Sequence, residues 1–488
     1  MLLPEAKLYI DGAMRSAAGG RTYDDIGPWT GEVVAKAADA SAEDVSAAIV
    51  AARRAFDATD WSRRHTERHD LLKRFLQLLR THRERLVAIA RHEVGSALGA
   101  ASGAQVDGAI EGADDVVKLF PSIRWEEDRG RRQQYGFTTE RKVLREAVGV
   151  VGAITPWNVP FYVNLGKVVP ALLAGCTVVL KPAPESPAAG AVLGELAIEA
   201  GFPAGVLNVV TSSDPAMAGE MLVTDRRVDL ISFTGSTAIG KRIMEKGGPT
   251  LKRLFLELGG KSANIVLDDA PDFAATVMRA IVCFHAGQGC AISTRLLVPK
   301  RRYAEAVGAL EKAYAGFATR WGDFDDPTQV MGPVISRRQL DRVMGYIELG
   351  KREGARLLAG GRTRTDKGGG FFVEPTCFVD VRNDMRIAQE EIFGPVLVVI
   401  PFEDDEDAIR IANDSDYGLS AMVSSGDPQR AMRVARRLRT GSVSVNGGLC
   451  IAGDLPFGGY KRSGVGREWG LEGIEEYLET KAIGIAVR

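Results

Sequence analysis

The sequence predicts an α/β protein with two domains, each built around a mainly parallel sheet. Short runs that are apolar throughout alternate with helical segments from residue 148 onward. Such strands are typical of a parallel sheet that helices cover on both faces. A second alternating region follows at about 271–456. The chain has 488 residues, 45% of them hydrophobic and 26% charged, which is enough for two to four globular domains.

The N-terminal part of the chain is predicted to form a hairpin and two helices. An Asp-Gly pair between short apolar runs at 8–14 is typical of a hairpin turn. Residues 41–57 place Ser41 and Asp44 ahead of apolar positions at helical spacing, which indicates an N-capped helix. Residues 66–94 carry an apolar face and are predicted as one long amphipathic helix.

The first alternating region supplies the strands of the first sheet. Strands are expected at 148–154, 177–180, 206–211, 228–233, 251–258 and 264–267. Helices are expected up to 173, over 186–200 and 215–223, and after 235. In such sheets ligands bind at the carboxyl ends of the strands. Asn158, Lys181 and Gly235 all fall at these ends.

The second alternating region is predicted to form a second α/β domain that carries Cys290. Its expected strands include 295–299, 396–402 and 441–445. Two further segments fit neither sheet: residues 134–148 are predicted as a hairpin-like pair of strands and 480–487 as a terminal strand. Exposed strands need a partner, from the same chain or from another subunit.

Composition and charge exclude several classes of protein. A formal net charge of -1 gives no field that would attract nucleic acid or an anionic membrane. We expect no signal peptide and no membrane span, because no apolar run approaches the roughly 18 residues that a span needs. The five cysteines form no CxxC pair, so neither a disulfide framework nor a metal site is expected. These features predict a cytoplasmic protein.

Two residues are candidates for chemistry. Cys290 follows Gly-Gln-Gly, a flexible backbone that permits close approach, although most free cysteines are inert and buried. Glu257 lies where an apolar strand meets two glycines. Burial would raise the pKa of this carboxyl toward that of a useful base. A salt bridge with Lys261 or Lys252 explains Glu257 equally well.

Two further features could bind a nucleotide. Residues 235–242 follow a strand and open a helix, and a helix N-terminus with glycines can bind phosphate. The spacing is close to a P-loop, but Arg242 stands where a Ser or Thr would hold magnesium, and no GxGxxG motif occurs. A tight strand–helix turn is an equally good reading. Lys181 could bond a ribose or phosphate, although most such lysines only face solvent.

Seven short motifs, in order along nearly the whole chain, resemble those of the aldehyde dehydrogenase superfamily. They are Pro156-Trp157-Asn158, Lys181-Pro182, Phe233-Thr-Gly-Ser-Thr-x-x-Gly240, Leu256-Glu257-Leu-Gly-Gly-Lys261, Gly287-Gln288-Gly289-Cys290, Glu390-Glu391-Ile-Phe393-Gly-Pro395 and Pro456-Phe457-Gly-Gly-Tyr-Lys461-x-Ser-Gly464. The resemblance implies oxidation of an aldehyde to a carboxylic acid with NAD(P) as hydride acceptor. The implied fold has two α/β domains and a small β element for oligomerisation or bridging.

The resemblance also implies roles for the reacting groups. Cys290 would attack the carbonyl to give a thiohemiacetal and then a thioester. The Asn158 amide and the Cys290 N–H would form the oxyanion hole. Glu257 would activate the hydrolytic water, and its presence favours hydrolysis over transfer to coenzyme A. A CoA-acylating semialdehyde dehydrogenase and a catalytically silent structural member of the fold remain alternatives.

For the cofactor, the resemblance places Lys181 on the adenosine ribose, Gly235 and Ser236 at the pyrophosphate, and Glu391 on the nicotinamide ribose. The remaining implied contacts are Ile154, Trp157, Pro184, Ile239, Gly240, Leu258 and Phe393. Pro184 stands where NAD-preferring members often carry a glutamate, and Glu185 follows it. NAD is favoured, and NADP is possible.

The resemblance implies an apolar substrate pocket. Its residues would be Val159, Val163, Gly166, Phe284, Leu449, Ile451 and Phe457. No arginine is evident to hold a second carboxylate, so we expect a medium-sized or bulky hydrophobic aldehyde. His285 beside this pocket is unusual, and a supporting hydrogen bond is its simplest role.

The resemblance also implies a division of the chain. Residues 1–128 and 148–258 would form the cofactor-binding domain and 259–458 the catalytic domain. Residues 129–147 and 459–488 would form the oligomerisation or bridging segments. A homodimer or homotetramer is expected, with the small-molecule aldehyde as the other partner.

Overall fold

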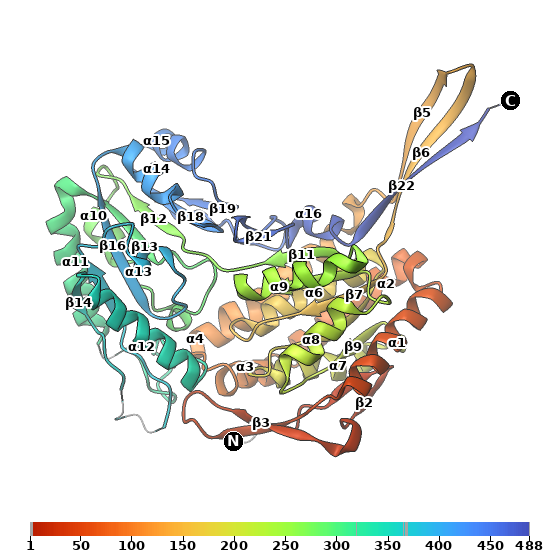
Figure 1. Cartoon of the computed structure of the whole chain (residues 1–488), viewed down its shortest axis with the longest axis horizontal. Coiled ribbons are helices and arrows are strands. Elements are labelled where there is room, and N and C mark those ends of the chain that lie inside the picture. Colours follow the sequence, from red (N-terminus) through yellow and green to blue (C-terminus); the bar gives the residue numbers. More distant parts are fainter. Residues whose placement is uncertain (1–2, 319, 365, 367–368, 488) are drawn as a thin grey trace.

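A computed structural model describes residues 3–318, 320–364, 366 and 369–487. Two α/β lobes lie side by side, and a long β arm projects from one of them (Figure 1). The C-terminus lies near the tip of the arm, and the N-terminus lies at the opposite side of the molecule (Figure 1). The chain therefore has the two parallel-sheet units that the alternating pattern predicts.

The first sheet has eight strands in the order β2-β1-β9-β8-β7-β10-β11-β21. Their bounds are β1 Leu8–Ile10, β2 Ala13–Arg15, β7 Val150–Ile154, β8 Thr177–Lys181, β9 Leu207–Val209, β10 Leu230–Thr234, β11 Arg253–Glu257 and β21 Gly464–Val465. The five strands from β9 to β11 are parallel. The strand order reverses direction between β7 and β10, which is where open α/β sheets bind ligands.

Helices cover both faces of this sheet. On one face pack α1 (Ala42–Ala58), α8 (Pro215–Thr224) and α9 (Thr237–Gly247). On the other pack α6 (Pro160–Ala174) and α7 (Pro187–Ala200), with α2 (His65–Thr81), α3 (Arg83–His92) and α5 (Gly108–Lys118) behind them. Because alternate residues of each strand point to opposite faces, strands buried on both sides must be apolar throughout.

Local signals in the sequence account for several of these elements. The capping box of Ser41 and Asp44 opens α1 as expected. The Asp11-Gly12 turn, with both residues at positive φ, joins β1 to β2. The prediction of a single helix over 66–94 is wrong, because the helix breaks at His82 into α2 and α3. The apolar spacing continues across the break, so periodicity alone does not reveal it.

The second sheet has seven strands in the order β14-β15-β16-β13-β12-β18-β19, of which all but β14 are parallel. Their bounds are β12 Ala263–Val266, β13 Arg295–Pro299, β14 Arg356–Ala359, β15 Thr376–Val379, β16 Val396–Phe402, β18 Ser420–Ser424 and β19 Ser442–Val445. The covering helices are α10 Phe273–Met278, α11 Tyr303–Phe317, α12 Arg337–Arg352, α14 Asp405–Asn413 and α15 Pro428–Ala435. The strands predicted at 295–299, 396–402 and 441–445 are confirmed. The strand predicted at 264–267 forms as β12, but its predicted place in the first sheet is wrong, because it pairs with β13 and β18 of the second.

The arm is a three-stranded antiparallel sheet of β5 (Glu126–Gln134), β6 (Phe137–Ala147) and β22 (Leu478–Ala486). The strand pair predicted over 134–148 is therefore misplaced: its turn is Tyr135-Gly136, and the first strand begins at Glu126. Its charged sequence resembles a solvated loop, but the charges pair across the strands, as Arg131 does with Glu140 and Arg145 with Glu127. Tyr135 at the tip is exposed.

Two observations concern the described residues only. No helix among them is long and apolar enough to cross a bilayer. No group of three or more of their His, Cys, Asp and Glu side chains is placed as metal ligands would be.

Candidate active site

The carboxyl ends of four neighbouring strands bring the predicted residues into one row. Ile154 of β7 lies opposite Lys181 of β8, and Thr234 of β10 lies opposite Glu257 of β11. β7 and β10 are themselves paired, with Phe233 opposite Ile154. Residues more than a hundred positions apart in sequence therefore share the switch-point edge of the first sheet.

Glu257 is the most unusual of these side chains. It is 2% exposed, and neither carboxylate oxygen has a hydrogen-bond partner within the described part of the chain. Burial, reinforced by the charge of Glu468, raises the pKa of Glu257 well above its ordinary value. The salt bridges with Lys261 or Lys252 that could have explained this residue are not formed.

The two glycines after Glu257 let other groups approach. A Cβ atom at Gly259 would lie 2.5 Å from a carboxylate oxygen of Glu391, and one at Gly260 would lie 2.7 Å from the carbonyl oxygen of Cys290. The Gly260 N–H donates to Glu391 at 3.0 Å. Any side chain at these positions would displace Glu391 or Cys290. The two glycines therefore allow the segments that carry Glu257, Glu391 and Cys290 to approach one another at the site.

Cys290 lies in the loop that follows a short 3-10 turn, Phe284–Gly287. The residue is partly exposed. Burial of the sulfur, followed by the charge of Glu257, raises the pKa of the thiol to about 12. The charges of Glu391 and Glu468 add to this effect on the pKa of the thiol. The thiol is therefore protonated at neutral pH until a base takes its proton.

Asn158 is buried, and its side chain is hydrogen-bonded to the loop that carries Cys290. Its side-chain Nδ2 donates to the carbonyl oxygen of Gln288 at 2.9 Å, and its own carbonyl accepts from Gln105 Nε2 at 2.8 Å. The amide thus lies against the segment that leads into Cys290. Cys290, Glu257 and Asn158, which come from three separate parts of the sequence, converge between the lobes.

A second set of residues lines the neighbouring sheet edge. Lys181 is buried, and its Nζ donates to the Pro182 carbonyl at 3.2 Å. Burial lowers the pKa of Lys181 to about 8. Ser236 caps α9 by accepting from the Ile239 N–H, and Gly240 on that helix packs against Leu258.

The amino end of α9 follows β10 and so opens at the same sheet edge as Lys181 of β8, with β7 between the two strands. The exposed Ile239 lies in the first turn of α9. The rings of Trp157 and Phe393 meet edge to face at 5.4 Å. Phe393 follows Glu391, so these two predicted contacts come from one short segment.

Comparison with known proteins decides the family. The pattern of the aldehyde dehydrogenase family matches residues 14–483, nearly the whole chain. The chain belongs to the aldehyde dehydrogenase family. It is an NAD(P)-dependent oxidoreductase of that family, in which the catalytic group is a cysteine. The family assignment made from seven short motifs is confirmed.

Relatives of known structure share the whole fold. An indole-3-acetaldehyde dehydrogenase from P. syringae, solved with NAD+ and IAA, is 38% identical with a TM-score of 0.94, covering 100% of this chain and 97% of that one. A Mycobacterium tuberculosis aldehyde dehydrogenase solved with NAD+ is 40% identical with a TM-score of 0.94, covering 99% and 98%. A 3-succinoylsemialdehyde-pyridine dehydrogenase from a Pseudomonas species is 41% identical over 483 residues, 98% of each chain.

In this aldehyde dehydrogenase, the residues predicted for the substrate pocket differ in depth. Val163 and Phe457 are buried, Val159 and Ile451 are partly buried, and Phe284 and Leu449 are exposed. Leu449, 80% exposed, is placed at a rim rather than in a closed pocket. The space beside Gly166 is filled: a Cβ there would lie 2.7 Å from the ring of Trp469.

Four side chains near the site were not predicted from the sequence: Tyr162, Trp469, Lys167 and Glu468. Tyr162 packs against Trp469 with ring centres 4.7 Å apart, and its pKa is raised by burial and by the charges of Glu468 and Cys290. Lys167 and Glu468 form a buried ion pair at 3.1 Å near Glu257. Lys167 is the only charged residue in the otherwise apolar stretch 160–174, a signal that could have identified it.

Proposed function

We propose that this aldehyde dehydrogenase oxidises a hydrophobic aldehyde, of aromatic or similar bulk, to its acid with NAD+ as cofactor. The observation that carries the proposal is Glu257. It is a buried carboxyl without a partner, and its charge reaches the thiol of Cys290. A structural glutamate would be paired, whereas a general base needs free lone pairs and a raised pKa.

Cys290 supplies the nucleophile. As the thiol attacks the aldehyde carbon, its proton passes to Glu257 and a carbon–sulfur bond forms, giving a thiohemiacetal. The Asn158 amide, together with the Cys290 N–H, donates hydrogen bonds to the oxygen on which negative charge develops. One such donor contributes a factor of about 10²–10³ in rate.

Glu257 then acts a second time. Loss of a hydride from the thiohemiacetal leaves a thioester on Cys290. Glu257 takes a proton from a water molecule, which attacks the thioester carbonyl, and the carbon–sulfur bond breaks to release the acid. The Lys167–Glu468 pair sits beside Glu257, so protons collected there have a neighbouring buried carboxylate to pass to.

The residues at the sheet edge fit a dinucleotide. The amino end of α9, with Gly235 and Ser236, would offer N–H groups to a pyrophosphate, and Lys181 would bond a ribose. Glu391 and the Trp157–Phe393 pair lie on the side of the thiol. The bound nicotinamide would accept the hydride. Three solved relatives hold NAD+, which supports NAD+ here.

The choice between NAD+ and NADP+ depends on Pro184 and Glu185. Pro184 offers no carboxylate, and Glu185 forms an ion pair at 3.2 Å with the exposed Arg338 of α12. Glu185 keeps a negative charge close to Lys181, where it opposes a 2′-phosphate. We therefore expect NAD+ to be preferred by a modest factor, with NADP+ accepted.

Aromatic side chains support the substrate class. Tyr162, whose ring packs against the buried Trp469, is close enough to Cys290 for the two groups to interact electrostatically. We infer that Phe457, Phe284, Val159 and Val163 complete an apolar wall of the substrate pocket. Two relatives carry names of aldehydes attached to an indole or a pyridine ring. An apolar, partly aromatic wall binds such rings through burial and edge-to-face contacts.

An aldehyde panel assayed with NAD+ and NADP+ in parallel tests the proposal. It should include an arylacetaldehyde, a medium-chain aliphatic aldehyde, a short aldehyde and a dicarboxylic semialdehyde. We expect the first two to have the highest kcat/KM and the acid to form without coenzyme A. NAD(P)H formation that requires coenzyme A, with an acyl-CoA thioester in place of the free acid as the product, would identify an acylating enzyme. No NAD(P)H across the panel would identify a silent member of the fold. A preference for the semialdehyde would overturn the substrate class.

A further inference from the structure

The loop before Cys290 contains a side chain that these roles do not use. His285 is 2% exposed, and its backbone is left-handed, with φ 45° and ψ 41°. The next residue, Ala286, is left-handed as well. Non-glycine residues rarely adopt this conformation, and they persist in it only where the surroundings impose it. The contacts of His285 show what imposes it.

One set of contacts runs from the imidazole to the backbone of Asn158. His285 Nδ1 lies 3.3 Å from Ser96 Oγ. Gln105 Nε2 donates both to Ser96 Oγ at 3.1 Å and to the Asn158 carbonyl at 2.8 Å. Ser96 and Gln105 are fully buried. Gln105 lies on a π-helical segment, Ala101–Asp107, a backbone form that often occurs at functional sites.

A second set of contacts runs from the backbone of His285 to the side chain of Asn158. The His285 carbonyl accepts from both the N–H and Nε2 of Gln288, each at 3.1 Å. The Gln288 carbonyl in turn accepts from Asn158 Nδ2 at 2.9 Å. Ile335 N–H holds the other end of the Gln288 side chain at 2.9 Å. Together these hydrogen bonds form a closed circuit that holds Asn158 at both its backbone carbonyl and its side-chain amide.

We propose that His285 is a positioning residue that fixes the Asn158 amide where the oxyanion of the intermediate forms. We call His285, Ser96, Gln105 and Gln288 the Asn158 clasp. The proposal rests on the oxyanion role given to Asn158 above. An oxyanion donor is effective only when its direction is set before the charge develops. The imidazole of His285 acts as a neutral hydrogen-bonding group, because burial lowers the pKa of His285 to about 4.

Two substitutions separate positioning from packing. His285→Asn keeps a polar atom near the place of Nδ1 and tolerates the left-handed backbone, but it removes the ring. His285→Phe keeps the ring volume and removes the hydrogen bond. We expect His285→Phe to lower kcat by about 10-fold with an unchanged KM for NAD+, and His285→Asn to recover most of that loss. If the Phe variant is the active one and the Asn variant the slow one, the residue only fills space and the proposal is wrong.

A double-mutant cycle with Asn158→Ala separates this proposal from the proposed function. We expect Asn158→Ala to lower kcat by about 10²–10³ and His285→Phe to add less than about 3-fold in that background. An unchanged kcat in Asn158→Ala would refute the oxyanion role itself. A slow Asn158→Ala with the full effect of His285→Phe added to it would refute the clasp alone. If His285→Phe fails to fold, Ser96→Ala cuts the same connection and enters the same cycle.

Discussion

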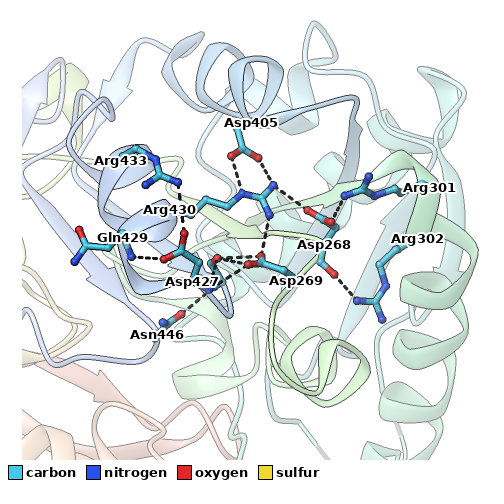
Figure 2. A network of polar contacts seen from close by, with 11 residues as sticks. Asp268, Asp269, Arg301, Arg302, Asp405, Asp427, Gln429, Arg430, Arg433 and Asn446 are labelled. Carbon is cyan, nitrogen blue, oxygen red and sulfur yellow. Dashed lines mark hydrogen bonds and ion pairs between the residues drawn. The ribbon is translucent and has the colours of Figure 1, made fainter.

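The two ends of β12 lie about 10 Å apart, at 3.3 Å per residue step. The polar side chains beyond one end are paired, and those before the other end are not, within the part of the chain that the structure describes. Beyond the carboxyl end, Asp268 and Asp269 enter a charge network centred on Arg430 (Figure 2). The guanidinium also binds Asp405 through two hydrogen bonds of 2.8 and 2.6 Å. Ser425, the residue that follows β18, donates to Asp269. Every carboxylate drawn there accepts from a guanidinium, and Arg302 donates to the Asp268 carbonyl at 2.6 Å.

Before the amino end of β12, the polar groups are buried without partners. Neither oxygen of Glu257, the Nζ of Lys261 nor the Oγ of Ser262 is bonded within the described ranges. Unpaired buried groups destabilise a fold by about 1–3 kcal/mol each. They persist where a substrate, a water molecule or a transferred proton will complete them. We infer that the paired end of the strand stabilises the lobe and that the unpaired end serves the proposed reaction.

Removing the thiol should give the largest effect. Cys290→Ala deletes the only atom that can form the carbon–sulfur bond, so we expect turnover to fall below detection while NAD+ binding is kept. Steady-state NADH formation and NAD+ titration by protein fluorescence measure the two properties. Cys377→Ala is the matched control, because that cysteine is buried in β15 away from the site. Substantial activity in Cys290→Ala would show that the nucleophile is a different residue.

Glu257→Gln should give the next largest effect. The amide preserves the shape of the side chain but cannot take a proton, and a general base contributes about 10²–10⁴ in rate. We expect a loss of at least 10² in the steady-state rate. A pre-steady-state time course with excess substrate should show the burst of NADH retained better than the later steady phase, because thioester hydrolysis depends most on this base. An unchanged steady-state rate contradicts the assignment.

Lowering the pH should reduce kcat and the stability of the fold over two different pH ranges. The active form of Glu257 is the carboxylate, and its pKa is raised, so kcat should fall about tenfold per pH unit below that raised pKa. Burial alone would raise the pKa of Asp269, but the Ser425 hydroxyl, the Asp427 N–H and Arg430 lower it. The stability that Asp269 contributes is present above its unfolded pKa of about 3.9 and is lost only as pH falls toward its lower folded value.

Activity should therefore disappear reversibly at a pH where the protein remains folded. Parallel pH profiles of kcat and of the melting temperature test this. Glu257→Gln serves as the control, because its residual kcat should lose the acid limb. Activity and melting temperature that fall together over the same pH range would contradict the contrast between the two ends.

The sequence was sufficient for the alternating elements and for the family. Apolar strands and capped helices are local signals, so β13, β16 and α1 agree with their predictions. The seven motifs identified the family because they occur in order along nearly the whole chain. Cys290, Glu257 and Asn158 were found through their motifs, although only the folded chain brings them together.

Residues defined by contacts across the chain could not be predicted. Trp469 fills the space beside Gly166, more than three hundred residues away, and no local pattern announces that contact. The pairing of Lys167 with Glu468 has the same cause. The arm strand β5 was missed because cross-strand ion pairs, rather than alternating apolar residues, define it. The role of His285 depends on Ser96 and Gln105, which only the π-helical turn brings close.

Arg430→Met should give the smallest effect on turnover and a clear effect on stability. The methionine keeps most of the side-chain volume but removes the cation that Asp405, Asp268 and Asp269 share, so that among the described residues only Asp268 keeps an ion pair, with Arg301. We expect a loss of about 1–3 kcal/mol in unfolding free energy with kcat unchanged at 25 °C. Urea unfolding and steady-state kinetics on the same preparation measure both quantities. Arg433→Met on the same helix removes a single exposed contact of 3.5 Å with Asp427 and should shift stability by less than about 0.5 kcal/mol. If Arg430→Met lowers kcat as strongly as Glu257→Gln does, the charge network belongs to the catalytic machinery and the contrast between the two ends of β12 is wrong.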